Sequence, residues 1–188
     1  IHQIYFMQTA PFFSDIVGLK DSQIGPAMTI GQFAEIAVMV ATGSLLAFFG
    51  FRWVIVIGCL AYFLRYLIFS IVTLPAWVIV SSQALHGLCY ACFFAAAFIY
   101  VDRVAPEDIR SSAQTVFGII ILGIGPVLGS YVVALLNRVY PAIDGVPDYA
   151  SLWRTLSLVA LATAIFFALF FRDESTAQES EAAEGKAA

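Results

Sequence analysis

The feature that most constrains this chain is a series of long apolar stretches that are almost free of charged residues. Five of them have the length of about 20 apolar residues that a helix needs to cross a hydrocarbon core roughly 30 Å thick: residues 27–49, 53–74, 77–100, 112–136 and 152–171. Backbone amides in lipid must be paired within their own segment, and these stretches lack the alternation of a barrel strand. The sequence therefore predicts an all-α transmembrane fold.

A sixth apolar stretch, residues 1–13, is too short to span a membrane by itself. We expect it to be the outer part of a helix whose start is missing. Residues 172–188 are polar and rich in acidic side chains. Such a composition buries too little apolar surface to become ordered. The chain is therefore predicted to consist of a membrane part, residues 1–171, and a disordered cytoplasmic tail, residues 172–188.

Composition supports a membrane protein and argues against several other classes. Apolar residues make up 61% of the chain and charged residues 12%, whereas soluble domains have about 45–50% and about 25%. The sequence has no basic stripe, which argues against nucleic acid as a partner. Cys59, Cys89 and Cys92 all lie within apolar stretches, where we expect packing residues and neither a disulfide nor a metal site.

The distribution of Lys and Arg predicts the orientation, because these residues favour the cytoplasmic side. The connections on one side and the tail hold five of them: Arg52, Arg103, Arg110, Arg172 and Lys186. The opposite side holds three: Lys20, Arg138 and Arg154. We therefore expect a multi-pass protein whose C-terminus is cytoplasmic.

A few polar residues lie deep within the predicted helices. Glu35 and Arg65 are each about 12 Å from the outer boundary, and His86 is about 15 Å from it, at 1.5 Å of rise per residue. Gln32 shares a helical face with Glu35, and Tyr90 lies one turn beyond His86. Ionisable groups at this depth are costly and usually face a cavity or each other. Their matching depths on successive helices indicate a shared polar layer.

Each of these residues also has a purely structural interpretation. Glu35 could be protonated and packed, and Arg65 could be its structural ion-pair partner or extend towards the interface. His86 and Gln32 could hydrogen-bond between helices, as polar residues often do in membrane bundles. From the residues alone, Glu35 is the strongest candidate for solute contact, and we expect Arg65 to lie next to it.

Four segments occur in an order that resembles a known family. They are Gly-Gln-Phe-Ala-Glu at 31–35, Leu-Arg-Tyr-Leu-Ile-Phe at 64–69, the segment from His86 to Phe94, and Ala-Pro-Glu-Asp-Ile-Arg-Ser-Ser-Ala-Gln at 105–114. Together they resemble the C-terminal half of bacterial nucleoside:proton symporters of the major facilitator superfamily. The resemblance covers nearly all of the chain except the tail. It implies a six-helix half, helices seven to twelve of a twelve-helix fold, with the first helix truncated.

The resemblance also implies a function and a set of site residues. The family's glutamine and glutamate on helix eight correspond to Gln32 and Glu35 and contact the solute, and a glutamine on helix seven corresponds to Gln3. The aromatic positions on helix ten correspond to His86 and Tyr90, where His86 departs from the family pattern. Ala91 also departs, because an aspartate often follows the second aromatic residue.

The implied activity is the import of a nucleoside with a proton across the bacterial inner membrane, driven by the proton gradient without a cofactor. The partners are the nucleoside, the proton, the lipid bilayer and an N-terminal six-helix half of the same transporter. Glu35 suits ribose hydroxyls, Gln32 a base edge and Tyr90 a stacked ring. Glu35 is the candidate for proton coupling, with Arg65 as a possible ion-pair partner.

Two other functional classes remain open at this point. A major facilitator that carries a sugar, an organic acid or a drug would share the helices without these roles for Gln32 and Glu35. A membrane enzyme or scaffold is the other possibility. The sequence contains no H-E-x-x-H, G-x-S-x-G or phosphate-binding glycine motif, and the absence of these motifs weakens the enzyme interpretation.

Overall fold

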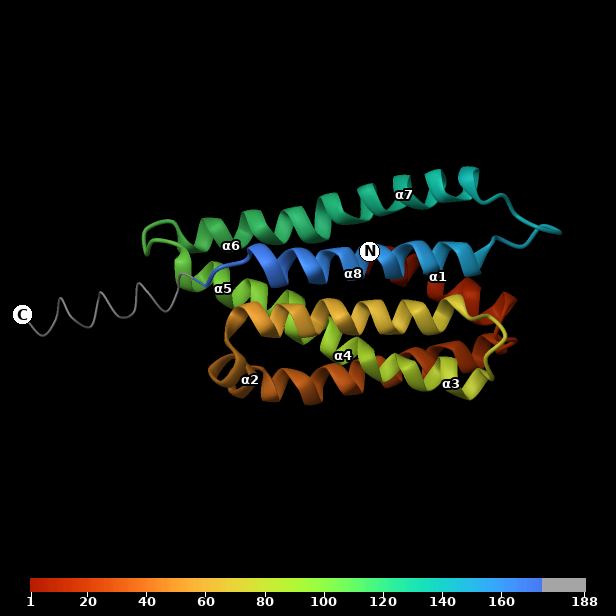
Figure 1. The fold of residues 1–188 in the computed structure, drawn as a ribbon, viewed down its shortest axis with the longest axis horizontal. Helices are drawn as coiled ribbons and strands as arrows, with labels where there is room; N and C mark the ends of the chain where they lie inside the picture. The colour runs from red at the N-terminus through yellow and green to blue at the C-terminus, as the bar shows by residue number, and fades with distance from the viewer. Residues whose placement is uncertain (174–188) are drawn as a thin grey trace, which may run out of the picture.

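The structure, a computed structural model, describes residues 1–173. In this part of the chain nearly all residues are helical, as the sequence predicts, and the helices form long rods that lie side by side (Figure 1). The one β feature described is an isolated bridge between Ile143 and Val146 in a connection. Except for Arg172 and Asp173, the predicted tail lies outside the described residues.

Each rod corresponds to one or two of the apolar stretches, but the rods begin and end at other residues than the stretches do. They begin with α1 (His2–Asp15) and α2 (Asp21–Ser70). The next rod, Ala76–Val104, combines α3 (Ala76–Ser81), η1 (Ser82–Ala84), α4 (Leu85–Cys89), the π-helical η2 (Tyr90–Ala95) and α5 (Ala96–Val104). The rod Arg110–Val139 combines α6 (Arg110–Ile119), the π-helical η3 (Ile120–Ile124) and α7 (Gly125–Val139). The last rod is α8 (Tyr149–Phe170).

The helix α2 contains two of the predicted stretches, separated at Gly50. This glycine has φ 71° and ψ 168°, a conformation that residues with a side chain rarely adopt. The ribbon reverses direction there (Figure 1). We call residues 21–49 the first arm of α2 and residues 51–70 its second arm. Arg52, just after the reversal, donates a hydrogen bond to the carbonyl oxygen of Ala168 near the end of α8.

Four helices of the described chain are long and apolar enough to cross a membrane: Asp21–Ser70, Ala76–Val104, Arg110–Val139 and Tyr149–Phe170. The count is lower than the five predicted stretches because α2 is one of the four and includes both of its arms. Only 11% of the most apolar part of Arg110–Val139 is buried, and large apolar side chains such as Leu122 and Tyr131 face outwards. An apolar outer surface of this kind suits contact with lipid.

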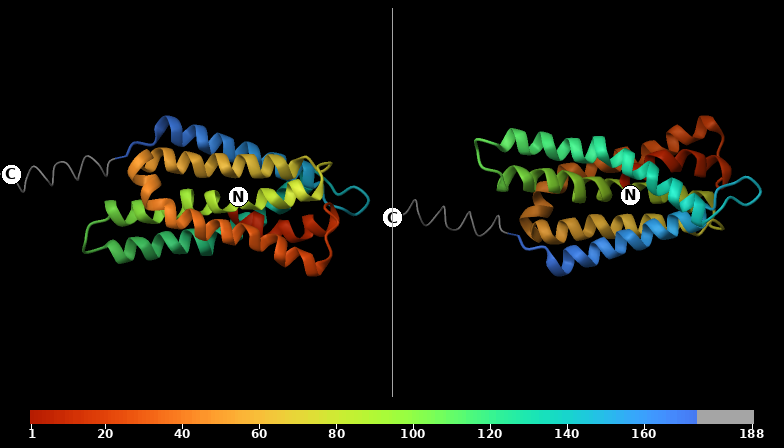
Figure 2. Two further views of the ribbon diagram at one scale, coloured as in Figure 1. Left: turned by 90° about the horizontal axis from the view of Figure 1, so that it is seen from below. Right: turned by 90° about the horizontal axis from the view of Figure 1, so that it is seen from above.

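The main apolar core lies where α8 packs against the second arm of α2 and against α1. In both views of Figure 2, α8 runs beside the second arm. At the centre of this core Trp153 of α8 stacks on Tyr66 at a ring distance of 5.3 Å and meets the rings of Phe69 and Phe12 edge-on at 5.2 and 5.7 Å. All four side chains are fully buried. The cysteines Cys59, Cys89 and Cys92 are free and buried.

Two glycines bring α4 unusually close to the first arm of α2. A Cβ atom added at Gly87 would lie 2.5 Å from the backbone carbon and oxygen of Ala34, and one added at Gly31 would lie 2.9 Å from the Cβ atom of His86. Neither distance is compatible with a normal van der Waals contact. The absence of both side chains therefore allows the backbones to meet, and this contact sets His86 beside Glu35.

Candidate functional site

A buried cation occupies the interior of the bundle. Arg65, on the second arm of α2, is fully buried. Its guanidinium lies over the ring of Tyr5 at 4.0 Å, and the rings of Tyr66 and Tyr62 are 5.2 and 5.6 Å away. Aromatic faces attract a cation through the negative charge above the ring. Three tyrosines from two helices therefore form a cage that stabilises the charge of Arg65 away from water.

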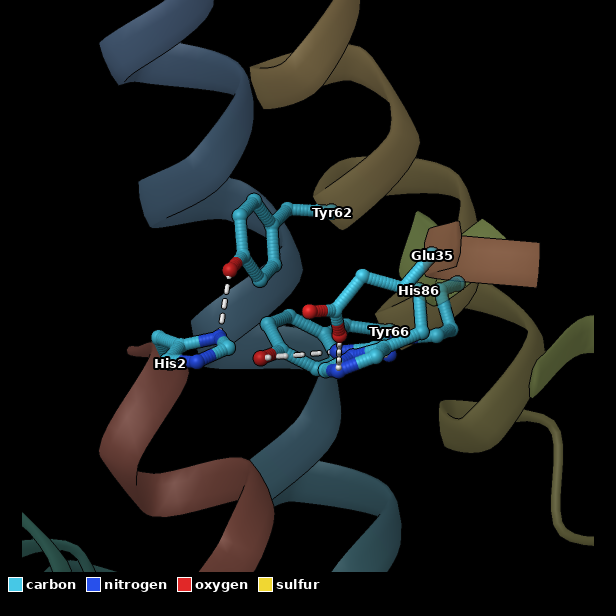
Figure 3. Close-up of polar contacts among 6 residues, drawn as sticks. His2, Glu35, Tyr62, Tyr66 and His86 are labelled. Carbon is cyan, nitrogen blue, oxygen red and sulfur yellow. Dashed lines mark hydrogen bonds and ion pairs between the residues drawn. The ribbon is translucent and has the colours of Figure 1, made fainter. Parts of the chain in front are cut away.

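The two ring nitrogens of His86 link Arg65 to Glu35. Arg65 Nη1 is 2.8 Å from His86 Nδ1, and His86 Nε2 is 3.6 Å from Glu35 Oε2. The first distance is a hydrogen bond; the second is an electrostatic contact slightly longer than one. In Figure 3 one carboxylate oxygen of Glu35 points at the imidazole and the other points away from it. The side chain of Glu35 keeps 22% of its surface exposed, whereas that of His86 keeps 3%.

This arrangement corrects the expected direct pairing of Arg65 with Glu35. Among residues 1–173 the ion-pair contact of Glu35 is with His86, and the hydrogen bonds of Arg65 go to His86 and to the hydroxyl of Tyr66. The matching depths correctly placed the three side chains in one layer. Depth does not give the rotation of each helix about its axis. The close approach at Gly87 inserts the imidazole between the two charges.

A second polar pair lies beside the first, and sequence reasoning missed it. His2 Nδ1 and the Tyr62 hydroxyl are 2.5 Å apart, and the His2 ring stacks on His86 at 5.6 Å. His2 is buried although it is the second residue of the chain. The chain contains only two histidines, so the presence of one in the short apolar stretch 1–13 was the available signal.

The other predicted site residues lie around this cluster without joining it. Gln32 is exposed on the first arm of α2. Tyr90 is half-buried, and its ring centre is 6.0 Å from that of His2. Gln3 is half-buried on the side of α1 that faces α7, where its Cγ would lie 3.5 Å from a Cβ added at Gly125. The structure therefore brings Glu35, His86 and Arg65 into contact and leaves Gln32, Tyr90 and Gln3 outside this contact.

A cavity of about 590 Å³ adjoins the cluster but is separate from it. Its lining comes from α1, the second arm of α2, η2, η3, α7 and α8, and it is almost entirely apolar. His2, Gln3 and Tyr62 line it, whereas Glu35, His86, Gln32 and Tyr90 do not. The His2–Tyr62 pair therefore lies at the boundary between an apolar space and the charged cluster.

The cluster combines a hydrogen-bond acceptor with two titratable side chains, Glu35 and His86. A partly exposed carboxylate accepts hydrogen bonds from hydroxyl groups, and the neighbouring imidazole limits the orientations that it adopts. No group of three His, Cys, Asp or Glu side chains within residues 1–173 is placed to hold a metal ion.

The apolar rods and this buried charged cluster define a multi-pass membrane protein. Comparison with known proteins narrows the class. A sequence profile described as "Nucleoside H+ symporter" matches residues 1–176. The chain therefore belongs to the nucleoside H+ symporter family, and the resemblance seen in the sequence is confirmed.

Individual relatives agree with this assignment. YegT of Escherichia coli (strain K12) is 27% identical over 166 residues, which are 84% of this chain and 39% of that protein. The xanthosine permease of the same organism is 26% identical over 165 residues, 86% of this chain and 39% of the permease. Its nucleoside permease NupG is 24% identical over 148 residues, 77% of this chain and 35% of NupG. The chain thus spans well under half the length of the curated relatives that it matches.

Solved structures show the same fold. A crystal structure of a mutant of the nucleoside transporter NupG superimposes with a TM-score of 0.72 at 24% identity, covering 91% of this chain and 42% of that one. A second NupG crystal structure gives a TM-score of 0.70 at 22% identity with the same coverage. The arrangement of helices is therefore that of part of a NupG-like transporter.

Proposed function

We propose that this chain is the C-terminal half of a secondary active transporter that imports nucleosides together with protons by alternating access. The observation that carries the proposal is the partly exposed carboxylate of Glu35, which lies within the helical bundle against a buried imidazole. Membership of the nucleoside H+ symporter family supports both the solute and the proton. A facilitator for another small solute remains the alternative.

The proposed architecture has six spans. When the two arms of α2 are counted separately, the rods correspond to helices seven to twelve of a twelve-helix major facilitator fold, with α1 as helix seven. An N-terminal six-helix half would complete the transporter, since the aligned segments make up only 35–39% of the relatives. In such folds the solute binds near the midplane, between halves that rock against each other. The proposed location is the bacterial inner membrane with a cytoplasmic C-terminus.

The proposed solute contacts follow from the chemistry of a nucleoside. The carboxylate oxygen of Glu35 that points away from His86 accepts a hydrogen bond from a ribose hydroxyl. The amide of Gln32 lies on the same helical face and forms hydrogen bonds with the edge of the base. Tyr90 offers an aromatic face on which a base stacks. His86 contributes by orienting Glu35, and Gln3 of α1 lines the neighbouring cavity. A carboxylate in a low-dielectric site also exchanges a proton as its surroundings change, so Glu35 is the proposed coupling residue.

Glu35→Gln in the full-length transporter tests this proposal, because it keeps the shape and removes the charge. We expect normal membrane levels, a steep fall in nucleoside uptake, and weaker discrimination against 2′- and 3′-deoxy analogues. If Glu35 carries the proton, the variant should still exchange nucleoside across the membrane but fail to concentrate it. Asp144→Asn is the matched control: Asp144 has φ 52° in an exposed connection, where an amide side chain is tolerated.

Full concentrative uptake by the Glu35→Gln variant, with unchanged analogue preference, would contradict the proposed role of Glu35. Uptake of a sugar or organic acid by the parent protein, without nucleoside uptake, would favour the alternative facilitator.

A further inference from the structure

The contacts of His86 determine which ring nitrogen carries its hydrogen. A guanidinium has only donors, and Arg65 Nη1 lies 2.8 Å from His86 Nδ1. His86 Nδ1 must therefore accept this hydrogen bond and bear no hydrogen. A neutral imidazole has one N–H group, so the hydrogen is on Nε2, the nitrogen that is 3.6 Å from Glu35 Oε2.

The same geometry keeps His86 neutral. An added proton would go to Nδ1, where it would face an N–H group of Arg65 and break the hydrogen bond. It would also place a second positive charge beside a cation that is already fully buried, and like charges in such a site are strongly disfavoured. A proton that enters the cluster therefore has to be taken by another group.

The surrounding titratable groups leave Glu35 as that group. The other titratable side chains that pack around Arg65 and His86 are phenols, a second imidazole and a thiol: Tyr5 and His2 of α1, Tyr62 and Tyr66 of α2, and Cys89 of α4. Phenols and thiols are neutral near pH 7. The His2 ring stacks on His86 at 5.6 Å, so a proton on His2 would place a second positive charge close to the buried Arg65. Glu35 is the one carboxylate that the described structure places against this cluster.

We propose that Arg65 and His86 act together as positioning residues for Glu35. Arg65 holds His86 in the neutral form with its hydrogen on Nε2, and this N–H group holds one oxygen of Glu35. The second oxygen is left for the solute, and Glu35 becomes the proton-binding member of the three. This inference rests on the proposed transport function and adds the tautomer and the two residues that set it.

The tautomer can be measured directly in the full-length transporter, reconstituted in lipid and labelled with ¹⁵N-histidine. The two ring nitrogens give different ¹⁵N shifts according to which one is protonated, and His86→Phe assigns the signals of His86. We expect an unprotonated Nδ1 and a protonated Nε2 in the parent protein. Arg65→Lys retains a buried donor and should keep this tautomer, whereas Arg65→Met should allow the Nδ1–H form. Arg154→Met, an exposed arginine on α8, is the control and should change nothing.

Transport kinetics provide a second measurement. His86→Phe keeps an aromatic ring against Tyr5 and His2 but removes both nitrogens. We expect the KM for ribonucleosides to rise roughly fivefold, the factor that corresponds to one hydrogen bond of ordinary strength, with a smaller change in kcat. Discrimination between ribonucleosides and their deoxy analogues should weaken by a similar factor.

The outcomes separate this inference from the proposed function. A hydrogen on Nδ1, or a doubly protonated ring, in the parent protein would overturn the inference even if nucleoside uptake were normal. Unchanged KM and analogue preference in His86→Phe would also overturn it. The expected tautomer in a protein that carries a different solute would support the positioning of Glu35 while refuting the nucleoside assignment.

Discussion

The contact between α4 and the first arm of α2 is the packing feature on which the cluster depends, and Gly87→Ala perturbs it directly. The added methyl group would lie 2.5 Å from the carbonyl carbon and oxygen of Ala34 and 2.8 Å from the amide nitrogen of Glu35. Non-bonded carbon atoms prefer separations of about 3.5–4.0 Å, so the two helices must move apart by roughly 1 Å. The neighbouring atoms are backbone and cannot turn away.

Overpacking of this kind costs about 1–3 kcal/mol of folding free energy. The higher helix propensity of alanine offsets less than ~1 kcal/mol of that cost. The 3.6 Å between His86 Nε2 and Glu35 Oε2 would also lengthen beyond 4 Å, which ends their contact. We therefore expect Gly87→Ala to lower both the thermal stability and the nucleoside affinity of the full-length transporter.

Thermal unfolding of the purified protein and radiolabelled nucleoside binding measure the two effects. Gly43→Ala is the matched control. Gly43 lies in the first arm of α2, the arm that α4 contacts, and an added Cβ there meets nothing within 4 Å. The control should be as stable as the parent or slightly more stable. If the two variants had equal melting temperatures and equal affinities, the argument from close approach would be wrong.

Two further predictions concern the ends of elements. Asp148 accepts a hydrogen bond from the Ser151 amide at 3.0 Å at the start of α8, and this bond holds the pKa of its carboxyl below the ordinary value. Asp148→Ala should lower the free energy of unfolding by about 1 kcal/mol. This loss of stability should be complete at a pH above the ordinary pKa of an aspartate and should disappear as the pH falls through the lowered pKa of Asp148. Melting curves recorded across pH measure it. Deletion of residues 175–188, which lie outside the described structure, should leave uptake unchanged at equal membrane levels; reduced uptake would show that the tail has a further role.

The sequence predicted the helices because lipid leaves the backbone no other way to pair its polar groups. It was less accurate on where they begin. The helix α2 begins at Asp21, although the apolar stretch begins at residue 27. The side chain of Gln23 accepts a hydrogen bond from the Lys20 amide at 2.9 Å and caps the start. Polar residues can thus extend a helix beyond its apolar part, here through Pro26, and a hydropathy pattern does not predict this extension.

The pattern of apolar residues also did not predict the π-helical turns within the rods. The π-helical segments η2 and η3 each insert into a stretch that reads as uniformly apolar. A π-turn changes the rotation of everything that follows it without changing the composition. The position of a residue along its rod could therefore be predicted, whereas the direction in which a side chain points beyond a π-turn could not.

The same distinction explains what was right and wrong about the cluster. Counting residues along each helix placed Glu35, Arg65 and His86 in one layer, because rise per residue is nearly constant. The distance between the helices determines which two of the three side chains touch. Gly31 and Gly87 set that distance, although neither has a side chain that could bind a solute or a proton. With alanine at either position His86 could not lie as close to the first arm. The interposed imidazole, and with it the fixed tautomer, is therefore encoded as much by these two glycines as by the three polar residues.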